Sequence, residues 1–303
     1  MDALEPGILT GCRAATPAGI VEDTAIVLRD GRIAAVGRAG RAAPAAGGEA
    51  LDLGGLTVLP GFIDLHIHGA GGADAHAGEI APLAAFLPRC GVTAFLPTLA
   101  ADAEARTLDA LRAIARVRDE QARDNAGGAL ILGAHLEGPF LNPARAGAIP
   151  PEHLRPADPV RAGRLLDAAP GLVRLMTVAP DAPGAIDLIP ELARRGVVVS
   201  LGHTAADYGL FRRAVDAGAR HTTHLFNAMT GLHHRAPGAA GAALTDDRVT
   251  VELIADGEHV HPAMLALAIR ARGVDRVALV SDAVGPAGLP PGEYRWFGRR
   301  VVS

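Results

Sequence analysis

Two histidines, His66 and His68, end an apolar stretch that reads "PGFIDLHIH", and a glycine-rich run follows them at once. Residues i and i+2 of a β-strand point to the same side, so a strand here would aim both imidazoles at one point. Imidazole nitrogens are ligands for zinc, iron(II) and manganese. The spacing therefore predicts a metal site where a rigid strand gives way to a flexible loop.

Ionisable residues also end five further apolar stretches of the chain. They are Glu137, His203, His224, Asp256 with His259, and Asp282. A single histidine at such a position usually has a structural role, but histidines and carboxylates gathered at several strand ends favour joint metal binding. The same chain contains no lysine, since all 29 basic residues are arginines. A Schiff base and a carbamylated lysine that bridges two metals are therefore excluded, which leaves Glu137 as the natural bridge.

The remaining seven histidines have weaker claims to a role in this site. His135 precedes Glu137 by two residues and is expected to support the ligands from behind. His221 is a rival ligand to His224, and His261 follows His259 by two residues. The other four are expected to lie in solvated loops: His76, His153, His233 and His234.

The elements that position these residues are eight apolar segments that alternate with helical stretches rich in alanine, leucine and arginine. The segments are 57–66, 91–98, 129–138, 172–180, 196–203, 220–226, 249–257 and 276–282. This alternation predicts an α/β fold, a (β/α)₈ barrel, in which chemistry takes place at the carboxyl ends of the strands. A doubly wound open sheet is the alternative, although no glycine-rich phosphate turn follows the first segment.

The first part of the chain has a different pattern of apolar residues. Residues 7–58 contain short alternating segments broken by glycine and aspartate, which predict a few antiparallel strands with tight turns. The expected organisation is therefore a small β domain over residues 1–56 and a barrel over residues 57–303.

Composition limits the partners and the compartment. The 303 residues are 49% hydrophobic with a net charge of −4, which suits a globular protein with a large core and gives no basic excess for nucleic acid. The N-terminus does not read as a secretory signal, and no apolar run has the roughly 18 residues of a membrane span. Two cysteines without a metal or redox motif suit the cytoplasm.

Six motifs together carry a family resemblance over nearly the whole chain. They are "PGFIDLHIHG", "HLEGPFLNP", "GHT", "THLFNAM", "IADGEHVHP" and "SDAVGPAG". The chain resembles the N-acetylglucosamine-6-phosphate deacetylases of the amidohydrolase superfamily. The resemblance implies an amidohydrolase-type barrel with a small β-sandwich. It implies hydrolysis of the acetamide of N-acetylglucosamine 6-phosphate, which gives glucosamine 6-phosphate and acetate in amino-sugar catabolism.

The same resemblance implies roles for particular residues. Glu137, His203 and His224 would hold the principal divalent ion, which could be Zn²⁺, Fe²⁺ or Mn²⁺. The presence of the histidine pair implies a second ion, held by His66, His68 and Asp282 with Glu137 shared. Asp282 would also act as the catalytic base and then as the acid. Four residues match substrate-binding positions: Asn227, the backbone of Ala228, Arg235 and His259. In relatives the equivalent of Arg235 can reach across a dimer interface, so a homodimer is expected.

Two features depart from the family pattern. Ile149 stands where relatives usually carry a histidine that contacts substrate, and an apolar side chain cannot donate a hydrogen bond. Relatives also continue beyond the equivalent of Ser303, so we expect the barrel to be truncated after its eighth strand and the β-sandwich to be incomplete. An amidohydrolase for another N-acyl amino sugar and an inactive truncated relative therefore stand as alternatives.

Overall fold

The structure is a computed structural model, which describes residues 7–38, 49–124, 127–296 and 299–302. The chain divides into two compact units, Met1–Gly61 and Phe62–Ser303. Within the described residues, no helix combines the length and the apolar character that a membrane-spanning segment requires.

The first unit contains a sheet of five strands in the order β3-β2-β1-β4, with β5 also paired to β1. The strands are β1 (Ile8–Thr16), β2 (Gly19–Arg29), β3 (Arg32–Arg38), β4 (Ala50–Asp52) and β5 (Thr57–Val58). The first three strands are antiparallel, as predicted. Strands β4 and β5 instead run parallel to β1. A parallel pair requires a connection that returns the chain to the same end of the sheet, and local sequence pattern does not reveal that crossover.

The second unit contains the eight predicted barrel strands, hydrogen-bonded side by side in parallel. They are β6 (Phe62–Ile67), β9 (Val92–Ala100), the two-part strand β10 (Leu130–Ile131) and β11 (Ala134–Glu137), β12 (Val173–Val178), β13 (Val198–Leu201), β14 (His221–Thr222), β15 (Thr250–Ile254) and β16 (Val277–Val280). β6 pairs with β9, and an isolated bridge between Ile67 and Ala283 joins the first strand to the segment after the last. The predicted (β/α)₈ barrel is confirmed, and the open doubly wound sheet is excluded.

The first predicted barrel segment is divided between the two units. Thr57 and Val58 pair with β1 of the small sheet, and the barrel strand begins only at Phe62. Pro60 lies between them and has no N–H to donate to a ladder. The proline thus marks the break in an apolar run that reads as a single strand.

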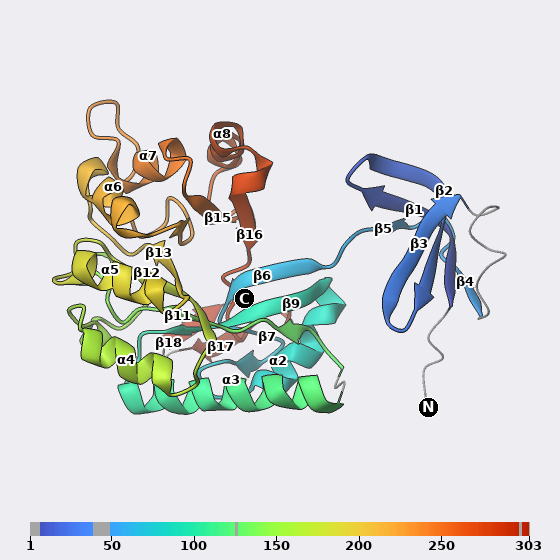
Figure 1. Ribbon diagram of the computed structural model, residues 1–303, viewed down its shortest axis with the longest axis horizontal. Coiled ribbons are helices and arrows are strands. Elements are labelled where there is room, and N and C mark those ends of the chain that lie inside the picture. The colour runs from blue at the N-terminus through green and yellow to red at the C-terminus, as the bar shows by residue number, and fades with distance from the viewer. Residues whose placement is uncertain (1–6, 39–48, 125–126, 297–298, 303) are drawn as a thin grey trace. The chain divides into compact units, whose positions relative to one another are not determined.

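Seven α-helices described in the second unit connect the strands. They are α2 (Ile80–Phe86), α3 (Glu104–Asp124), α4 (Pro159–Asp167), α5 (Ala185–Arg194), α6 (Tyr208–Ala217), α7 (Gly238–Thr245) and α8 (Pro262–Arg272). Helices α3 to α8 follow one another around the outside of the strands (Figure 1). Aspartates begin two of them, since Asp158 accepts from the amide of Val160 and Asp207 from that of Leu210.

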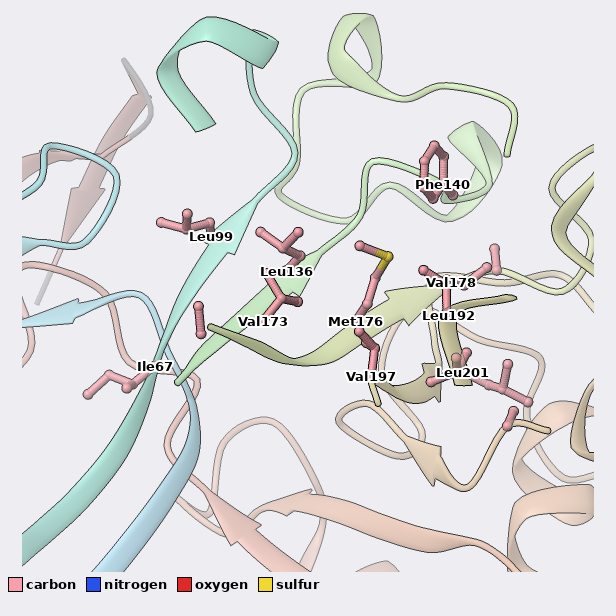
Figure 2. Close-up of a cluster of buried hydrophobic side chains, with 14 of the residues drawn as sticks. Ile67, Leu99, Leu136, Phe140, Val173, Met176, Val178, Leu192, Val197 and Leu201 are labelled. Atoms are coloured by element: carbon pink, nitrogen blue, oxygen red, sulfur yellow. The ribbon is translucent and has the colours of Figure 1, made fainter. Parts of the chain in front are cut away.

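The hydrophobic core holds the strands in place from the helix side and between neighbouring strands. Leu99, Leu136, Met176 and Leu201 come from four successive strands and belong to one buried cluster (Figure 2). Removing such a side chain, as in Leu136→Ala, costs about 2–5 kcal/mol of stability because it leaves a cavity. This packing fixes the strand ends that carry the candidate site.

Two short hairpins lie beyond the ends of the first and last barrel strands. One pairs β7 (Gly69–Ala70) with β8 (Ala73–Asp74) directly after the histidine pair. The other pairs β17 (Glu293–Trp296) with β18 (Arg299–Val302) near the end of the chain.

Candidate metal centre

The candidate ligands all lie at the carboxyl ends of barrel strands. His66 and Glu137 are on β6 and β11, while His203, His224 and Asp282 each follow their strand by two residues. The last three have positive φ angles of 47°, 28° and 50°. Left-handed backbone at a residue other than glycine costs of order 1–3 kcal/mol and persists only where the surroundings fix it. The strand ends are thus bent so that these side chains face one another.

The first group consists of Glu137, His203 and His224. Glu137 Oε1 lies 2.9 Å from Nε2 of His203 and 3.1 Å from Nε2 of His224. The two Nε2 atoms are themselves 3.1 Å apart. All three residues are buried, so three donor atoms from three strands converge on one point away from bulk water.

The second group consists of His66, His68 and Asp282, with Glu137 beside it. Asp282 Oδ1 lies 3.3 Å from His66 Nε2 and 3.2 Å from His68 Nε2. Glu137 approaches the same two nitrogens, at 3.5 Å with Oε1 and at 3.4 Å with Oε2. Glu137 therefore lies between the two groups, where a bridging carboxylate would have to be.

The hydrogen bonds on the far side of the rings show which nitrogens carry protons. Nδ1 of His203 lies 2.8 Å from the backbone carbonyl of Arg145. Nδ1 of His68 lies 3.1 Å from the carbonyl of Thr98. A carbonyl only accepts, so each Nδ1 must donate, and in a neutral ring Nε2 then presents a lone pair. Lone pairs that face carboxylates at about 3 Å fit a cation, and imidazole nitrogen with carboxylate oxygen suits a divalent one.

The charges of the site also favour a bound cation. Burial alone would lower the pKa of His66, but Asp282, Glu252 and Glu137 raise it to about 10. Burial likewise opposes protonation of His68, yet hydrogen bonds to Asp282 and Glu137 raise its pKa to about 9. Burial would raise the pKa of Glu137, but the neighbouring imidazoles, His66 first, hold it well below its ordinary value. The carboxylates thus remain charged and favour positive charge among them.

A third set of possible ligands, His66, His135 and Glu252, lies behind the site. Both nitrogens of His135 already face hydroxyl groups, at 3.3 Å in Thr98 and at 2.8 Å in Thr177. These residues form a buried hydrogen-bond network under the ligands. His135 therefore lies in the network beneath the candidate ligands, and both of its ring nitrogens already face hydrogen-bond partners.

A cavity of about 220 Å³, open to solvent, lies over the two ligand groups. Its lining consists of His68, Glu137, Gly147, Ala148, Ile149, His203, His224, Asn227, Ala228, Ile254, His259, Asp282 and Trp296. His259 Nδ1 lies 2.6 Å from Asp256 Oδ2, and the Asp256 Oδ1 atom accepts from the His259 amide. This pairing leaves the other ring nitrogen of His259 available to a ligand in the cavity.

Three of the four predicted substrate-binding residues, Asn227, Ala228 and His259, therefore lie in the same cavity as the candidate metal ligands. Arg235 does not line this cavity and is exposed in the loop before α7. Ile149 does line it and also packs into a small apolar cluster with Leu141 and Leu154. One wall of the cavity is therefore apolar where a hydrogen-bond donor was the family expectation.

The positions of the remaining histidines agree only in part with the predictions. His76 was expected in a solvated loop but is buried, and burial with the charge of His68 lowers its pKa to about 3. His221 lies outside the first ligand group, with Nδ1 3.1 Å from Ser200 Oγ. His261 caps α8, because its Nδ1 accepts from the amide of Ala263. His233 and His234 are exposed, as predicted.

Two residues of the site were not predicted from the sequence. Glu252 is fully buried and hydrogen-bonds His66; its signal was a single charge within the apolar run "VTVELIA". Trp296 lies with its ring 5.7 Å from that of His68. It is the one tryptophan of the chain, but its segment has no pattern that ties it to the strand ends.

Comparison with known proteins places the chain in a family. The model of the amidohydrolase family matches residues 57–286. An N-acetylglucosamine-6-phosphate deacetylase of Bacillus subtilis is 40% identical over 250 residues, which are 81% of this chain and 62% of that protein. An N-acetylgalactosamine-6-phosphate deacetylase of Escherichia coli O157:H7 is 37% identical over 97% of this chain and 76% of its own length. The chain thus spans less than two thirds of the Bacillus protein.

A solved structure shows the same arrangement of elements. It is a mutant of N-acetyl-D-glucosamine-6-phosphate deacetylase from Mycobacterium smegmatis in complex with N-acetyl-D-glucosamine-6-phosphate. Its TM-score with this chain is 0.87 at 38% identity, and the match covers 97% of this chain and 74% of that one. The chain therefore belongs to the amidohydrolase family, and its resemblance to the N-acetylglucosamine-6-phosphate deacetylases of that family is confirmed.

Proposed function

We propose that the protein hydrolyses the acetamide of N-acetylglucosamine 6-phosphate to glucosamine 6-phosphate and acetate, as part of amino-sugar catabolism. The observation that carries the proposal is the convergence of Glu137, His203 and His224 within 3.1 Å under an open cavity. The names of the relatives supply the substrate class.

In this proposal the two ligand groups would hold one or two divalent ions. Such an ion would supply a Lewis acid that lowers the pKa of water and polarises an amide carbonyl. The protein contributes the fixed geometry. The Nδ1 hydrogen bonds aim the imidazoles, and the left-handed turns at His203, His224 and Asp282 present the side chains to the cavity.

Asp282 is the proposed acid–base group. Its side chain is 22% exposed, whereas that of Glu137 is 4% exposed, so Asp282 is the carboxylate that substrate and water can reach. It accepts the proton of the attacking water and then delivers it to the departing amine, which must be protonated to leave. One carboxylate thus serves both halves of the reaction.

The remaining residues are proposed to hold the sugar phosphate. Asn227, the backbone of Ala228 and His259 lie in the cavity. Arg235 has the fork of donors that suits a phosphate but lies outside the cavity of its own chain. This position fits a homodimer in which Arg235 of each copy serves the site of the other.

The experiment is an acetate-release assay on the purified chain with added Zn²⁺, Fe²⁺ or Mn²⁺. We expect release from N-acetylglucosamine 6-phosphate and much slower release from unphosphorylated N-acetylglucosamine. If the chain binds metal but releases no acetate from any N-acetylated sugar phosphate, the proposal is wrong and the inactive-relative alternative replaces it.

A second candidate substrate is N-acetylgalactosamine 6-phosphate. It is favoured by the Escherichia coli relative, which matches 97% of this chain, and by Ile149 in the wall of the cavity. The two sugars differ in the configuration of one hydroxyl, so the ratio of their kcat/KM values decides between them.

We also propose that the enzyme works in the cytoplasm. Both cysteines are unpaired, Cys12 in the interior and Cys90 at the surface. Unpaired cysteines suit a reducing compartment.

A further inference from the structure

We propose that Glu252 is a positioning residue that aims His66 and fixes His224, and thereby links the two ligand groups mechanically. The inference rests on the proposed function only in taking these groups as metal sites. Glu252 itself belongs to neither of the two groups that line the cavity.

One oxygen of Glu252 serves both groups at once. Oε2 accepts from Nδ1 of His66 at 3.0 Å and from the backbone amide of His224 at 3.0 Å. The side chain is fully buried on β15. Two ligands from strands far apart in the sequence therefore depend on the position of a single atom.

The bond to Nδ1 determines what His66 presents to the cavity. An ionised carboxylate only accepts, so Nδ1 carries the proton and Nε2 has the lone pair. That Nε2 lies 3.3 Å from His68 Nε2 and 3.3 Å from Asp282 Oδ1. A carboxylate behind an imidazole also makes the ring a more basic ligand, which a neutral amide does less well. Both orientation and basicity of His66 therefore depend on Glu252.

Glu252 also forms hydrogen bonds with the segment after β14, and these bonds stabilise a strained turn. His224 has a φ of 28°, which a residue with a β-carbon rarely adopts. The Glu252 side chain accepts from its amide, and the Glu252 backbone carbonyl accepts from the next amide, of Leu225, at 2.9 Å. Glu252 thus secures two consecutive amides at the point where His224 turns into the first ligand group.

The opposite side of Glu252 faces other buried groups rather than solvent. Its Oε1 lies 3.7 Å from Nδ1 of His221, which in turn lies 3.1 Å from Ser200 Oγ. Ser200 also lies 2.6 Å from Thr223 Oγ1, and among the described residues its side chain has no hydrogen bond to a proposed ligand. Ser200 therefore offers a matched control: a buried polar residue of the same network that is not hydrogen-bonded to the proposed ligands.

The test compares Zn²⁺ binding by wild type, Glu252→Gln and Ser200→Ala, each as the full 303-residue chain stripped of metal. Ions per chain are counted by elemental analysis, and both affinities are measured by competition with a chelating dye. Wild type should bind two ions. Glu252→Gln should weaken the His66–His68–Asp282 site by about 10- to 100-fold, whereas Ser200→Ala should leave both affinities within about threefold of wild type.

Glu252→Asp is measured beside them and covers the case in which the glutamine variant does not fold. It keeps the buried charge but withdraws the oxygen by about 1.5 Å, one carbon–carbon bond, so it should lose the same site. Unchanged affinities in either folded variant would overturn the inference, as would a wild type that binds one ion at saturation. If Ser200→Ala lost as much affinity for Zn²⁺ as Glu252→Gln, the role of Glu252 would be structural and not that of a positioning residue.

These readouts separate the inference from the proposed function, because no substrate is present. A wild type that binds two ions but releases no acetate would contradict the deacetylase proposal and leave the role of Glu252 intact. An active wild type whose Glu252→Gln variant keeps both ions would contradict only the role of Glu252.

Discussion

The backbone amide of Asp282 donates to the carbonyl of His66 at 2.8 Å. The amides of His68 and Gly69 both donate in return to the carbonyl of Ala283, at 2.8 and 3.1 Å. The first and last barrel strands are therefore joined at the residues that form the second ligand group. The separation of Asp282 from the histidine pair is set by main-chain hydrogen bonds rather than by flexible side chains.

Because these main-chain hydrogen bonds hold Asp282 in place, its proposed acid–base role can be tested by substitution. Asp282→Asn preserves the shape and the main-chain bonds but removes the group that accepts the proton. We expect kcat to fall by about 10²- to 10⁴-fold, while the ion at Glu137, His203 and His224 stays bound. Acetate release and elemental analysis measure the two effects on one sample.

Asp275→Asn provides the control, since Asp275 is an exposed aspartate that precedes the last barrel strand and lies outside the cavity lining. It should keep wild-type turnover. An Asp282→Asn variant that retains metal and most of its activity would show that another group moves the proton.

A second prediction concerns Arg235 and the proposed homodimer. Arg235→Ala should raise KM for the phosphorylated sugar far more than for the unphosphorylated one, because its guanidinium would bind the phosphate. Arg213→Ala removes another exposed arginine, on α6, and should change neither KM. Equal effects of Arg235→Ala on both sugars would exclude phosphate recognition by this residue.

Mixing two impaired variants, assayed at a substrate concentration well below the KM of Arg235→Ala, tests whether Arg235 of one copy serves the site of the other. A hybrid of Asp282→Asn and Arg235→Ala chains contains one site with an intact Asp282 and an intact Arg235 from its partner. Random exchange of subunits should then restore about a quarter of the wild-type rate. No recovery after unfolding and refolding the mixture would show that each site uses its own Arg235.

The convergence of the candidate ligands at the strand ends was predictable because both their chemistry and their position leave a local trace in the sequence. His66 and His68 alternate on one strand, and His203, His224 and Asp282 each follow an apolar run at the edge where a parallel barrel gathers its functional groups. The turn that brings each side chain inward adds no sequence signal of its own. The residues at positive φ are histidine and aspartate here, not glycine.

Residues that act through tertiary contacts were not predictable in this way. Glu252 is separated from His66 by 186 positions, and only the closure of the barrel brings them together. His76 looked like a loop residue because glycines surround it, yet the chain folds back and buries it. The parallel pairing of β4 and β5 to β1 is likewise a property of the connections between strands.

The barrel also carries a charge pair whose effect depends on pH. Arg248 donates to both oxygens of Asp246, at 2.8 and 2.6 Å, and this lowers the pKa of Asp246 from 3.8 to about 2 although burial opposes it. The folded-state pKa is lower than the unfolded one, so the stabilisation is present above about pH 4 and is lost as the pH falls towards 2.

Asp246→Asn should therefore lower the free energy of unfolding by about 1 kcal/mol at pH 7, a modest value because Arg248 is partly exposed. The difference from wild type should shrink between pH 4 and pH 2 in denaturant titrations. Asp216→Asn is the control, since Asp216 contacts the same arginine at 2.9 Å but is 61% exposed, and its effect should be smaller. A constant difference across this range would assign the loss to packing instead of charge.

Trp296 provides an optical signal for the cavity because it is the one tryptophan of the chain. Its ring lies 5.7 Å from that of His68 and lines the same cavity as His259 and Asn227. A sugar bound there would replace water at the indole, so adding N-acetylglucosamine 6-phosphate to the metal-loaded Asp282→Asn variant should change the emission. Trp296→Ala should raise KM by roughly 2- to 10-fold, the worth of one aromatic contact, and Trp296→Phe by less because a ring remains. If the enzyme is active but substrate does not change the tryptophan emission, and neither substitution changes KM, then the β17–β18 hairpin lies away from the bound sugar.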